Sequence, residues 1–429
     1  MFGDPKESSP KIKFRLGVEA VSFSPVVLGV EDAQIGLPNV LHGWLLGEVA
    51  GIALRAGGGK EGSTVEGVEL VEKIEVSLTR SDHFLSLTRP HGLILTFWPF
   101  GSSYQGLTIS LYPSLSPIIL LPYQKRPLAL SINQSFPLSS SLTSLTLRIT
   151  LASFDASASP LVVTLPLAHR SHWSSNSTSY PALRYTYLDS DLTVQYAMTQ
   201  PPLLPSDGTT SAVILATHGA GVETSSPFWT EALGERRKGL GWVVFATGKT
   251  REIVFLFPSP QSSGLTSSSL FSSLHLAWGY DWHGASAESV FSARKALGPI
   301  VLALEKKSRR NVDDEHWGVS DKTFLVGHSN GGQGASYLLE RYPDEFLGSA
   351  SAAGYLKIQS YVAYTQWASS HTIDPSLWGI LVSSLTSFEN DLHASNAAHL
   401  PFMLVHGTED DNVSSLSSLS ISHFLPFAN

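Results

Sequence analysis

Residues Gly327–Gly331 read Gly-His-Ser-Asn-Gly, so that a glycine stands two positions before and two positions after Ser329. An apolar run, Thr323–Val326, precedes this segment, and Gly332–Arg341 follows it with the pattern of a helix that begins with small residues. Such a pattern is typical of a sharp turn between a strand and a helix, where the serine backbone is strained and its neighbours must be tiny. The segment therefore predicts a strand, an exposed serine hydroxyl and a helix in immediate succession.

Composition excludes several classes of function. The chain of 429 residues has no cysteine, which excludes disulfides, thiolate catalysis and zinc–thiolate sites. The formal net charge is −8 and no cluster of lysine and arginine forms a stripe, which argues against nucleic acid as a partner. No residue pattern suggests a metal site or a cofactor, and we expect neither.

Targeting and membrane segments are also not expected. The stretch from Met1 to Phe14 is charged and lacks the apolar centre of a signal peptide. The most apolar stretches, Val40–Leu54 and Leu107–Leu121, are interrupted by a glutamate or by prolines, so neither predicts a membrane span. These features do not fix the compartment of the protein.

Residues 1–180 are predicted to form a small β-rich domain. Ile74–Arg80 and Leu145–Leu151 alternate apolar and polar residues, which is typical of strands buried on one face. A helix is conceivable only at Val40–Leu54. We expect a small antiparallel sandwich.

Residues 181–429 show a different pattern, in which short apolar runs alternate with helical segments. Continuous apolar runs indicate parallel strands that are covered on both faces, and their alternation with helices predicts a doubly wound, mostly parallel sheet. A hairpin is expected around Asp189–Asp191. The predicted strands are Leu183–Leu188, Leu192–Met198, Ala212–Thr217, Trp242–Ala246, Thr323–Val326, Phe346–Ala352 and Phe402–His406, and the predicted helices are Ala287–Lys306 and Gly332–Arg341.

Two segments, Ile253–Tyr280 and Asn412–Asn429, depart from this pattern. The first has 28 residues without one charged side chain, and both are rich in serine and leucine without a period that would bury one face. One hypothesis is that both are translated non-coding sequence, such as retained introns. The alternative is a surface loop and a tail, and the sequence leaves the two open.

A serine hydroxyl becomes a nucleophile only with a base, a group that orients the base, and donors for the oxyanion. The backbone N–H of Asn330 is predicted to be one oxyanion donor. The second donor is expected from the loop His218–Gly221, which follows an earlier strand, and specifically from Gly219 or Ala220. The predicted strand Phe402–His406 is followed by an acidic loop, which we expect at the same edge of the sheet. In this loop Asp410 is the expected orienting acid, with Glu409 and Asp411 as its neighbours.

The elbow Gly327–Gly332 with Tyr337–Asp344, and above all His406–Val413 (His-Gly-Thr-Glu-Asp-Asp-Asn-Val), resembles the prolyl oligopeptidase (S9) family of serine peptidases. The resemblance spans about Leu183–Val413 without the segment 253–280. It implies an α/β-hydrolase domain with Ser329 as nucleophile and Asp410 as triad acid. The aromatic segment Trp278–Gly284 is expected above the sheet, with no role assigned.

The chain departs from the family pattern in two respects. A seven-bladed β-propeller, at about 40 to 50 residues per blade, does not fit into the first 180 residues. Only 19 residues follow Asp410, too few for the usual helix and strand before the triad histidine, and they contain one histidine, His423. We therefore expect a C-terminally truncated domain that lacks the triad histidine of the family and in which His423 is the one available candidate for the base.

The expected function is a serine peptidase that acts on peptide substrates through an acyl-enzyme on Ser329. One alternative is an esterase, since the same elbow serves ester hydrolysis. Another is a non-catalytic protein that keeps the hydrolase fold.

Overall fold

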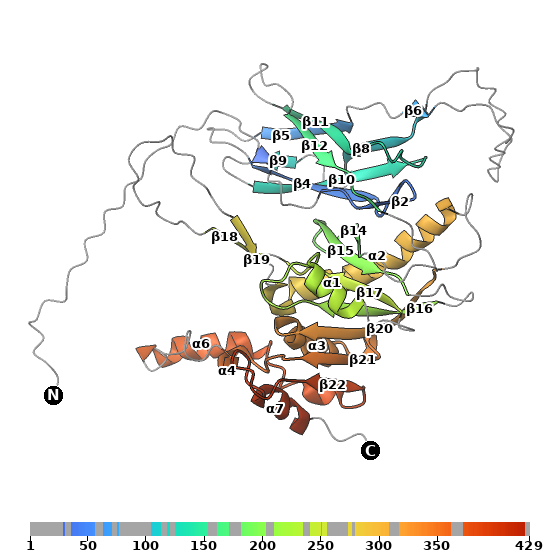
Figure 1. Cartoon of the computed structure of the whole chain (residues 1–429). Coiled ribbons are helices and arrows are strands. Elements are labelled where there is room, and N and C mark those ends of the chain that lie inside the picture. The colour runs from blue at the N-terminus through green and yellow to red at the C-terminus, as the bar shows by residue number, and fades with distance from the viewer. Residues whose placement is uncertain are drawn as a thin grey trace, which may run out of the picture.

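The computed structural model describes most of the chain, and its elements form a β-rich region stacked on a larger α/β region (Figure 1). The described residues are 29–30, 36–55, 63–70, 75–76, 104–112, 118–120, 125–152, 161–170, 182–202, 210–234, 241–249, 251–254, 273–276, 279–308, 317–361 and 372–424.

The β-rich region contains two four-stranded antiparallel sheets, in the orders β1-β4-β10-β8 and β12-β11-β5-β9. Both contribute to one apolar core, in which Leu128 and Leu130 of one sheet pack with Leu145, Leu147 and Ile149 of the other. The β-rich prediction is therefore confirmed. The strands are β1 (Gly29–Val30), β4 (Val49–Arg55), β5 (Ser63–Leu70), β8 (Leu107–Leu111), β9 (Ile118–Leu120), β10 (Lys125–Gln134), β11 (Ser144–Ala152) and β12 (Leu161–Pro166), with a separate pair β6 (Glu75–Val76) and β7 (Tyr104–Gln105).

The possible helix at Val40–Leu54 is wrong, because this stretch forms β2 (Val40–Leu41), β3 (Trp44–Leu45) and β4. The turn between β2 and β3 holds Gly43 at φ 83°, a left-handed conformation that interrupts a helix. A Cβ atom at Gly43 would also lie 2.6 Å from Cβ of Pro137. Strand β13 (His169–Arg170) pairs in parallel with β2.

The α/β region is built on a seven-stranded sheet in the order β14-β15-β17-β16-β20-β21-β22. The hairpin β14–β15 joins the sheet in antiparallel fashion at β17, and the remaining neighbours pair in parallel. The predicted mostly parallel sheet is thus confirmed. Its strands are β14 (Leu183–Leu188), β15 (Val194–Gln200), β16 (Ser211–Thr217), β17 (Trp242–Ala246), β20 (Val319–His328), β21 (Gly348–Ala352) and β22 (Phe402–Val405).

Helices cover both faces of this sheet, which explains why strand β17 is apolar throughout. Trp242 and Val244 lie in the core shared with α2 (Ala285–Ser308) and α3 (Asn330–Arg341). Val243 and Phe245 face the other side, where Trp229 of α1 (Pro227–Gly234) packs. No helix of the described residues is long and apolar enough to cross a membrane.

The C-terminal part adds short helices around the last two strands. These are η3 (Pro343–Glu345), α4 (Ile358–Tyr361), α6 (Pro375–Thr386), η5 (Ala394–Ala397) and α7 (Leu416–Phe424). The expectation that 412–429 has nothing to bury is wrong for α7, since Ile421 is 1% exposed and Val413, just before the helix, is 2% exposed. A short helix needs only one such apolar side to pack against the domain.

The segment Ile253–Tyr280 is described only at its two ends. Strand β18 (Arg251–Val254) pairs in antiparallel fashion with β19 (Ser273–Leu276), and the turn η2 (Gly279–Trp282) follows. Residues 255–272 and 277–278 lie outside the described residues. The hypothesis of translated non-coding sequence stays a prediction.

Candidate active site

Ser329 occupies the turn between β20 and α3 in a strained conformation. Its φ is 57° and its ψ is −120°, a combination that non-glycine residues rarely adopt. Two hydrogen bonds hold the turn: the N–H of Ser329 donates to the oxygen of Ala352 at 2.8 Å, and its oxygen accepts from the N–H of Gln333 at 3.0 Å. Strain of this kind persists where the surrounding structure over-determines it, and it is common at active sites.

The glycines around Ser329 are required by close backbone approach. A Cβ atom at Gly327 would lie 1.9 Å from the oxygen of Gly331, and one at Gly331 would lie 1.9 Å from the oxygen of Thr217. The hydroxyl of Thr217 also holds the end of β16 against the elbow, since its Oγ1 donates a hydrogen bond to the carbonyl oxygen of Gly331 at 2.7 Å. The elbow is thus pressed against the end of β16, and no larger residue fits at either glycine.

The loop after β16 touches the elbow, as the sequence predicted for an oxyanion site. A Cβ atom built on Gly219 would lie 3.4 Å from Cβ of Ser329. Asn330 is 6% exposed and is the first residue of α3, so its N–H lies at the positive end of the helix dipole. Gly219, with Ala220 next in the chain, and Asn330 therefore flank Ser329.

His218 is a packing residue of this loop. Its ring is 1% exposed and meets the ring of Trp282 edge-on, with centroids 4.9 Å apart. Because Nδ1 lies 2.9 Å from the carbonyl oxygen of Gly219, Nδ1 carries the proton of the neutral ring. Burial lowers the pKa of His218 to about 4, so the ring is neutral at physiological pH.

Trp282 connects this loop to the elbow helix, a role that the sequence did not reveal. The indole is fully buried and its Nε1 donates to the oxygen of His218 at 3.2 Å. Gly334 of α3 makes room for it, since a Cβ atom there would lie 2.5 Å from the Trp282 side chain. Trp282, from the aromatic segment 278–284, is therefore part of the frame of the site, and the mixed aromatic and glycine composition of the segment was the signal available in the sequence.

Asp410 lies beyond the end of β22, at the same edge of the sheet as Ser329. The strand register places His328 opposite Ala352 and Ala352 opposite Val405, so these carboxyl ends are level. Oδ1 of Asp410 accepts from the N–H groups of Val413 at 2.8 Å and Asn412 at 3.0 Å. These bonds, led by Val413, lower the pKa of Asp410, and the charges of His406 and His328 lower it further. Asp410 is consequently an ionised carboxylate.

His406 closes the loop that carries Asp410. Its Nε2 lies 2.8 Å from the oxygen of Val413 and 3.4 Å from Oδ2 of Asp410. Its Nδ1 lies 2.7 Å from the hydroxyl of Ser418 on α7. Both ring nitrogens are therefore engaged in holding the loop and the helix together.

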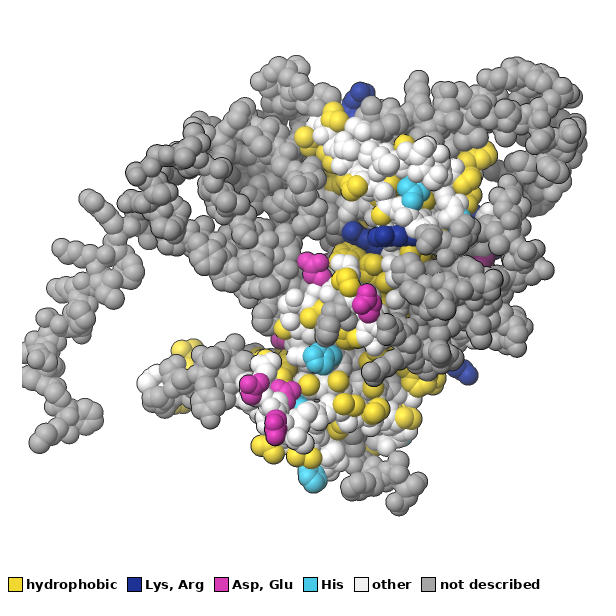
Figure 2. Space-filling model, in the orientation of Figure 1, with side chains coloured by type: hydrophobic (Ala, Val, Ile, Leu, Met, Phe, Trp, Pro, Cys, Tyr) yellow, Lys and Arg dark blue, Asp and Glu magenta, His cyan; other side chains and the backbone are white. Residues whose placement is uncertain are grey.

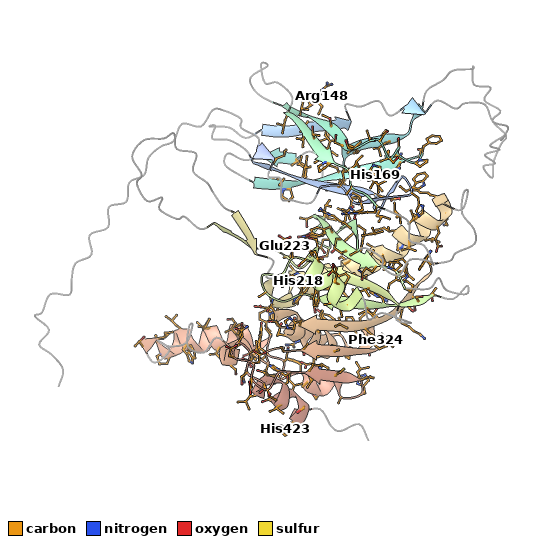
Figure 3. The ribbon with its side chains drawn as sticks, viewed as in Figure 1. Arg148, His169, His218, Glu223, Phe324 and His423 are labelled. Carbon is orange, nitrogen blue, oxygen red and sulfur yellow. The ribbon has the colours of Figure 1, made fainter. Side chains whose placement is uncertain are left out.

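The predicted base, His423, lies on α7 with its side chain exposed. Figure 3 shows it at the far end of the α/β region, well separated from His218, whose loop contacts Ser329. Among the described residues, His406 is the histidine in contact with Asp410. His328, exposed and adjacent to Ser329, is near enough for its charge to affect Asp410. The assignment of His423 as base stays a prediction.

A serine elbow at the carboxyl edge of a mostly parallel sheet, with a glycine loop beside it and an acid loop two strands away, defines an α/β-hydrolase domain. Residues 307–425 match the model of the prolyl oligopeptidase family. This part of the chain is therefore similar to that family of serine peptidases.

Known proteins share parts of the chain. An uncharacterised secreted protein of Arthroderma benhamiae is 29% identical over 224 residues, which are 51% of this chain and 20% of that protein. The acylaminoacyl peptidase of Pyrococcus horikoshii is 12% identical with a TM-score of 0.37, over 69% of this chain and 44% of that one. Dipeptidyl peptidase 4 of Porphyromonas gingivalis is 13% identical with a TM-score of 0.38, over 75% of this chain and 37% of that one. The chain thus spans about a fifth of its curated relative and less than half of these two structures.

Proposed function

We propose that this chain is a serine peptidase that cleaves peptide bonds through an acyl-enzyme on Ser329. The observation that carries the proposal is the strained conformation of Ser329, locked between two glycines and in contact with the loop at Gly219. Strain of this kind at a strand-to-helix turn is typical of a nucleophile elbow, where it exposes the serine hydroxyl for catalysis.

In the proposed reaction, Oγ of Ser329 attacks the carbonyl carbon of the substrate and the C–N bond then breaks. The N–H of Asn330 and an N–H of the Gly219–Ala220 loop stabilise the oxyanion. Asp410, held ionised by two backbone N–H groups, orients the base that takes the proton of Ser329 and passes it to the leaving amine. His423 is the candidate for this base after Asp410; its side chain is exposed on α7, so it would have to move to reach Ser329.

Turnover of amide and ester substrates tests the reaction class. A panel of aminoacyl-proline p-nitroanilides and p-nitrophenyl esters is incubated with the native chain and with Ser329→Ala. We expect amide cleavage by the native chain that Ser329→Ala abolishes. Turnover of the esters alone would establish an esterase, and turnover that survives Ser329→Ala would exclude the serine mechanism.

The exposed position of His423 favours a second candidate, a non-catalytic protein that binds peptides at the same edge. Loss of a triad member still leaves a rate about 10³ to 10⁴ times that of water through the oxyanion site and binding. A chain that binds the proline amides but cleaves neither amides nor esters would support this candidate.

A further inference from the structure

The turn η2 (Gly279–Trp282) is fixed against both halves of the candidate active site. Its last residue, Trp282, is anchored to the loop after β16 through the oxygen of His218 and to α3 through the space left by Gly334. The residue that precedes Trp282 in η2 is therefore held in a fixed position relative to Ser329. That residue is Asp281.

The backbone at this point is strained in two consecutive residues. Asp281 has a φ of 55° and Trp282 a φ of 61°, and neither is glycine. Residues held in the left-handed region at an active site are evidence of a functional constraint, since a glycine would relieve the strain. The turn buries the indole of Trp282 and leaves the carboxyl group of Asp281 half-buried beside the elbow.

The neighbours of Asp281 belong to the site. Burial raises its pKa, while the neighbouring side chains of Tyr355 and Asn330 oppose the rise. The charge of Asp281 in turn raises the pKa of Tyr355 beyond the effect of burial. Asn330 directly follows Ser329, so the carboxyl group lies next to the place where a substrate would react.

None of the groups among the described residues that shift the pKa of Asp281 is a cation. A carboxylate that loses much of its water and receives only neutral partners is left with unfavourable desolvation, and a cation brought by a ligand would offset it. A positive charge on a bound ligand would therefore stabilise the ionised carboxylate of Asp281.

The surroundings favour the same charge. Tyr355 stacks on Tyr361 with ring centroids 5.0 Å apart and planes 9° apart, and the hydroxyl of Tyr361 lies 3.4 Å from Oδ1 of Asn412. Asn412 follows the acidic residues 409–411, and acidic side chains gather on the α/β region in Figure 2. Aromatic faces and carboxylates together attract ammonium and guanidinium groups.

We propose that Asp281 is a specificity-determining residue that selects substrates with an ammonium or guanidinium group beside the scissile bond. The inference rests on the proposed function, because it places the substrate at Ser329. Asp281 would pair with the cation of the substrate and would take no part in bond cleavage.

The test compares lysine with norleucine, which has the same chain without the charge. Two peptidyl diphenyl phosphonates that differ only in this side chain are reacted with the native chain, with Asp281→Asn and with Asp281→Glu. Glu345→Gln, an exposed acid at the other end of α3, is the matched control. The readout is the second-order rate constant for modification of Ser329.

We expect the native chain and Glu345→Gln to react at least tenfold faster with the lysine compound. Asp281→Asn should bring the ratio close to one by slowing the lysine compound, with the norleucine rate changed less than threefold, and Asp281→Glu should keep most of the preference. A native ratio near one, or a ratio that Asp281→Asn leaves unchanged, overturns the proposal.

A second measurement separates this inference from the proposed function. Calorimetric binding of the lysine and norleucine peptides to Ser329→Ala, with and without Asp281→Asn, needs no reaction at the serine. A lysine preference that depends on Asp281 supports the inference even if Ser329 proves unreactive. Equal binding of both peptides contradicts it even if Ser329 is a nucleophile.

Discussion

His406 and Asp410 meet at the end of β22, where Nε2 of the ring lies 3.4 Å from Oδ2 of the carboxylate. The oxygen of Val413 can only accept a hydrogen bond, so Nε2 carries a proton, and in the neutral ring Nδ1 accepts from the hydroxyl of Ser418. His406 therefore holds the loop 407–413 closed, while the N–H groups of Val413 and Asn412 keep Asp410 ionised.

We predict that His406→Leu unfolds more easily than the native chain by about 2 to 3 kcal/mol, because it leaves buried partners without hydrogen bonds. Modification of Ser329 by phosphonates should also become slower, because the loop 407–413 that carries Asp410 loses the hydrogen bonds of His406. Urea denaturation measures the first effect. The exposed His423→Leu serves as the stability control and should stay within about 0.5 kcal/mol; equal losses in both variants would contradict the role of His406.

Substitution of Gly331 by alanine should disrupt the elbow. The added Cβ would lie 1.9 Å from the oxygen of Thr217, which is backbone and cannot move aside. We expect a loss of more than about 3 kcal/mol or a failure to fold. Gly379→Ala is the control, since its Cβ meets nothing within 4 Å on the exposed helix α6, and it should stabilise the chain by about 0.5 to 1 kcal/mol.

Removal of one partner from the ion pair of Lys249 with Asp189 should destabilise the chain strongly. Their atoms are 2.8 Å apart and the Asp189 side chain is 0% exposed, with a further bond from the hydroxyl of Ser289. Lys249→Met leaves this carboxylate buried without its cation, which costs about 3 to 5 kcal/mol. In Lys357→Met the partner Asp391 is 16% exposed and the lysine 33%, so chemical denaturation should show a loss below about 1 kcal/mol.

Glu340 gives the chain a pH-dependent weakness. It is 0% exposed, both of its carboxyl oxygens lack partners among the described residues, and burial raises its pKa to about 9. The folded state therefore keeps the proton while the unfolded state loses it, so stability falls as pH rises from about 4.5 toward 9.

Glu340→Gln should remove this dependence. We expect it to melt close to the native chain at pH 4.5 and at a higher temperature at pH 8, with the gap in free energy growing by up to about 1.4 kcal/mol per pH unit. Melting curves at both pH values measure the gap. A gap that is the same at both values would show that Glu340 does not titrate in this range.

Local patterns predicted much of the fold. The continuous apolar run at Trp242–Ala246 indicated a strand covered on two faces, and the structure places helices on both. Val40–Leu54 was ambiguous because an apolar stretch fits a helix or strands by composition. What decides it is the left-handed turn at Gly43 and its contact with Pro137, which is distant in sequence.

The site was predictable where chemistry and backbone geometry are local. Gly327, Ser329 and Gly331 form one turn, so their spacing was informative. Asp281 and Trp282 reach the elbow only through tertiary packing, on Gly334 and the oxygen of His218, and nothing in their own segment encodes those partners. His406 likewise depends on Ser418, a serine in a segment whose composition suggested no structure.

The most direct test of this account is the site of modification by a fluorophosphonate probe, mapped by peptide mass spectrometry. The account predicts one adduct, on Ser329 in the peptide that spans the elbow, and its loss in Ser329→Ala. No adduct in the folded native chain, or an adduct that persists in Ser329→Ala, would contradict the assignment of Ser329 as the nucleophile.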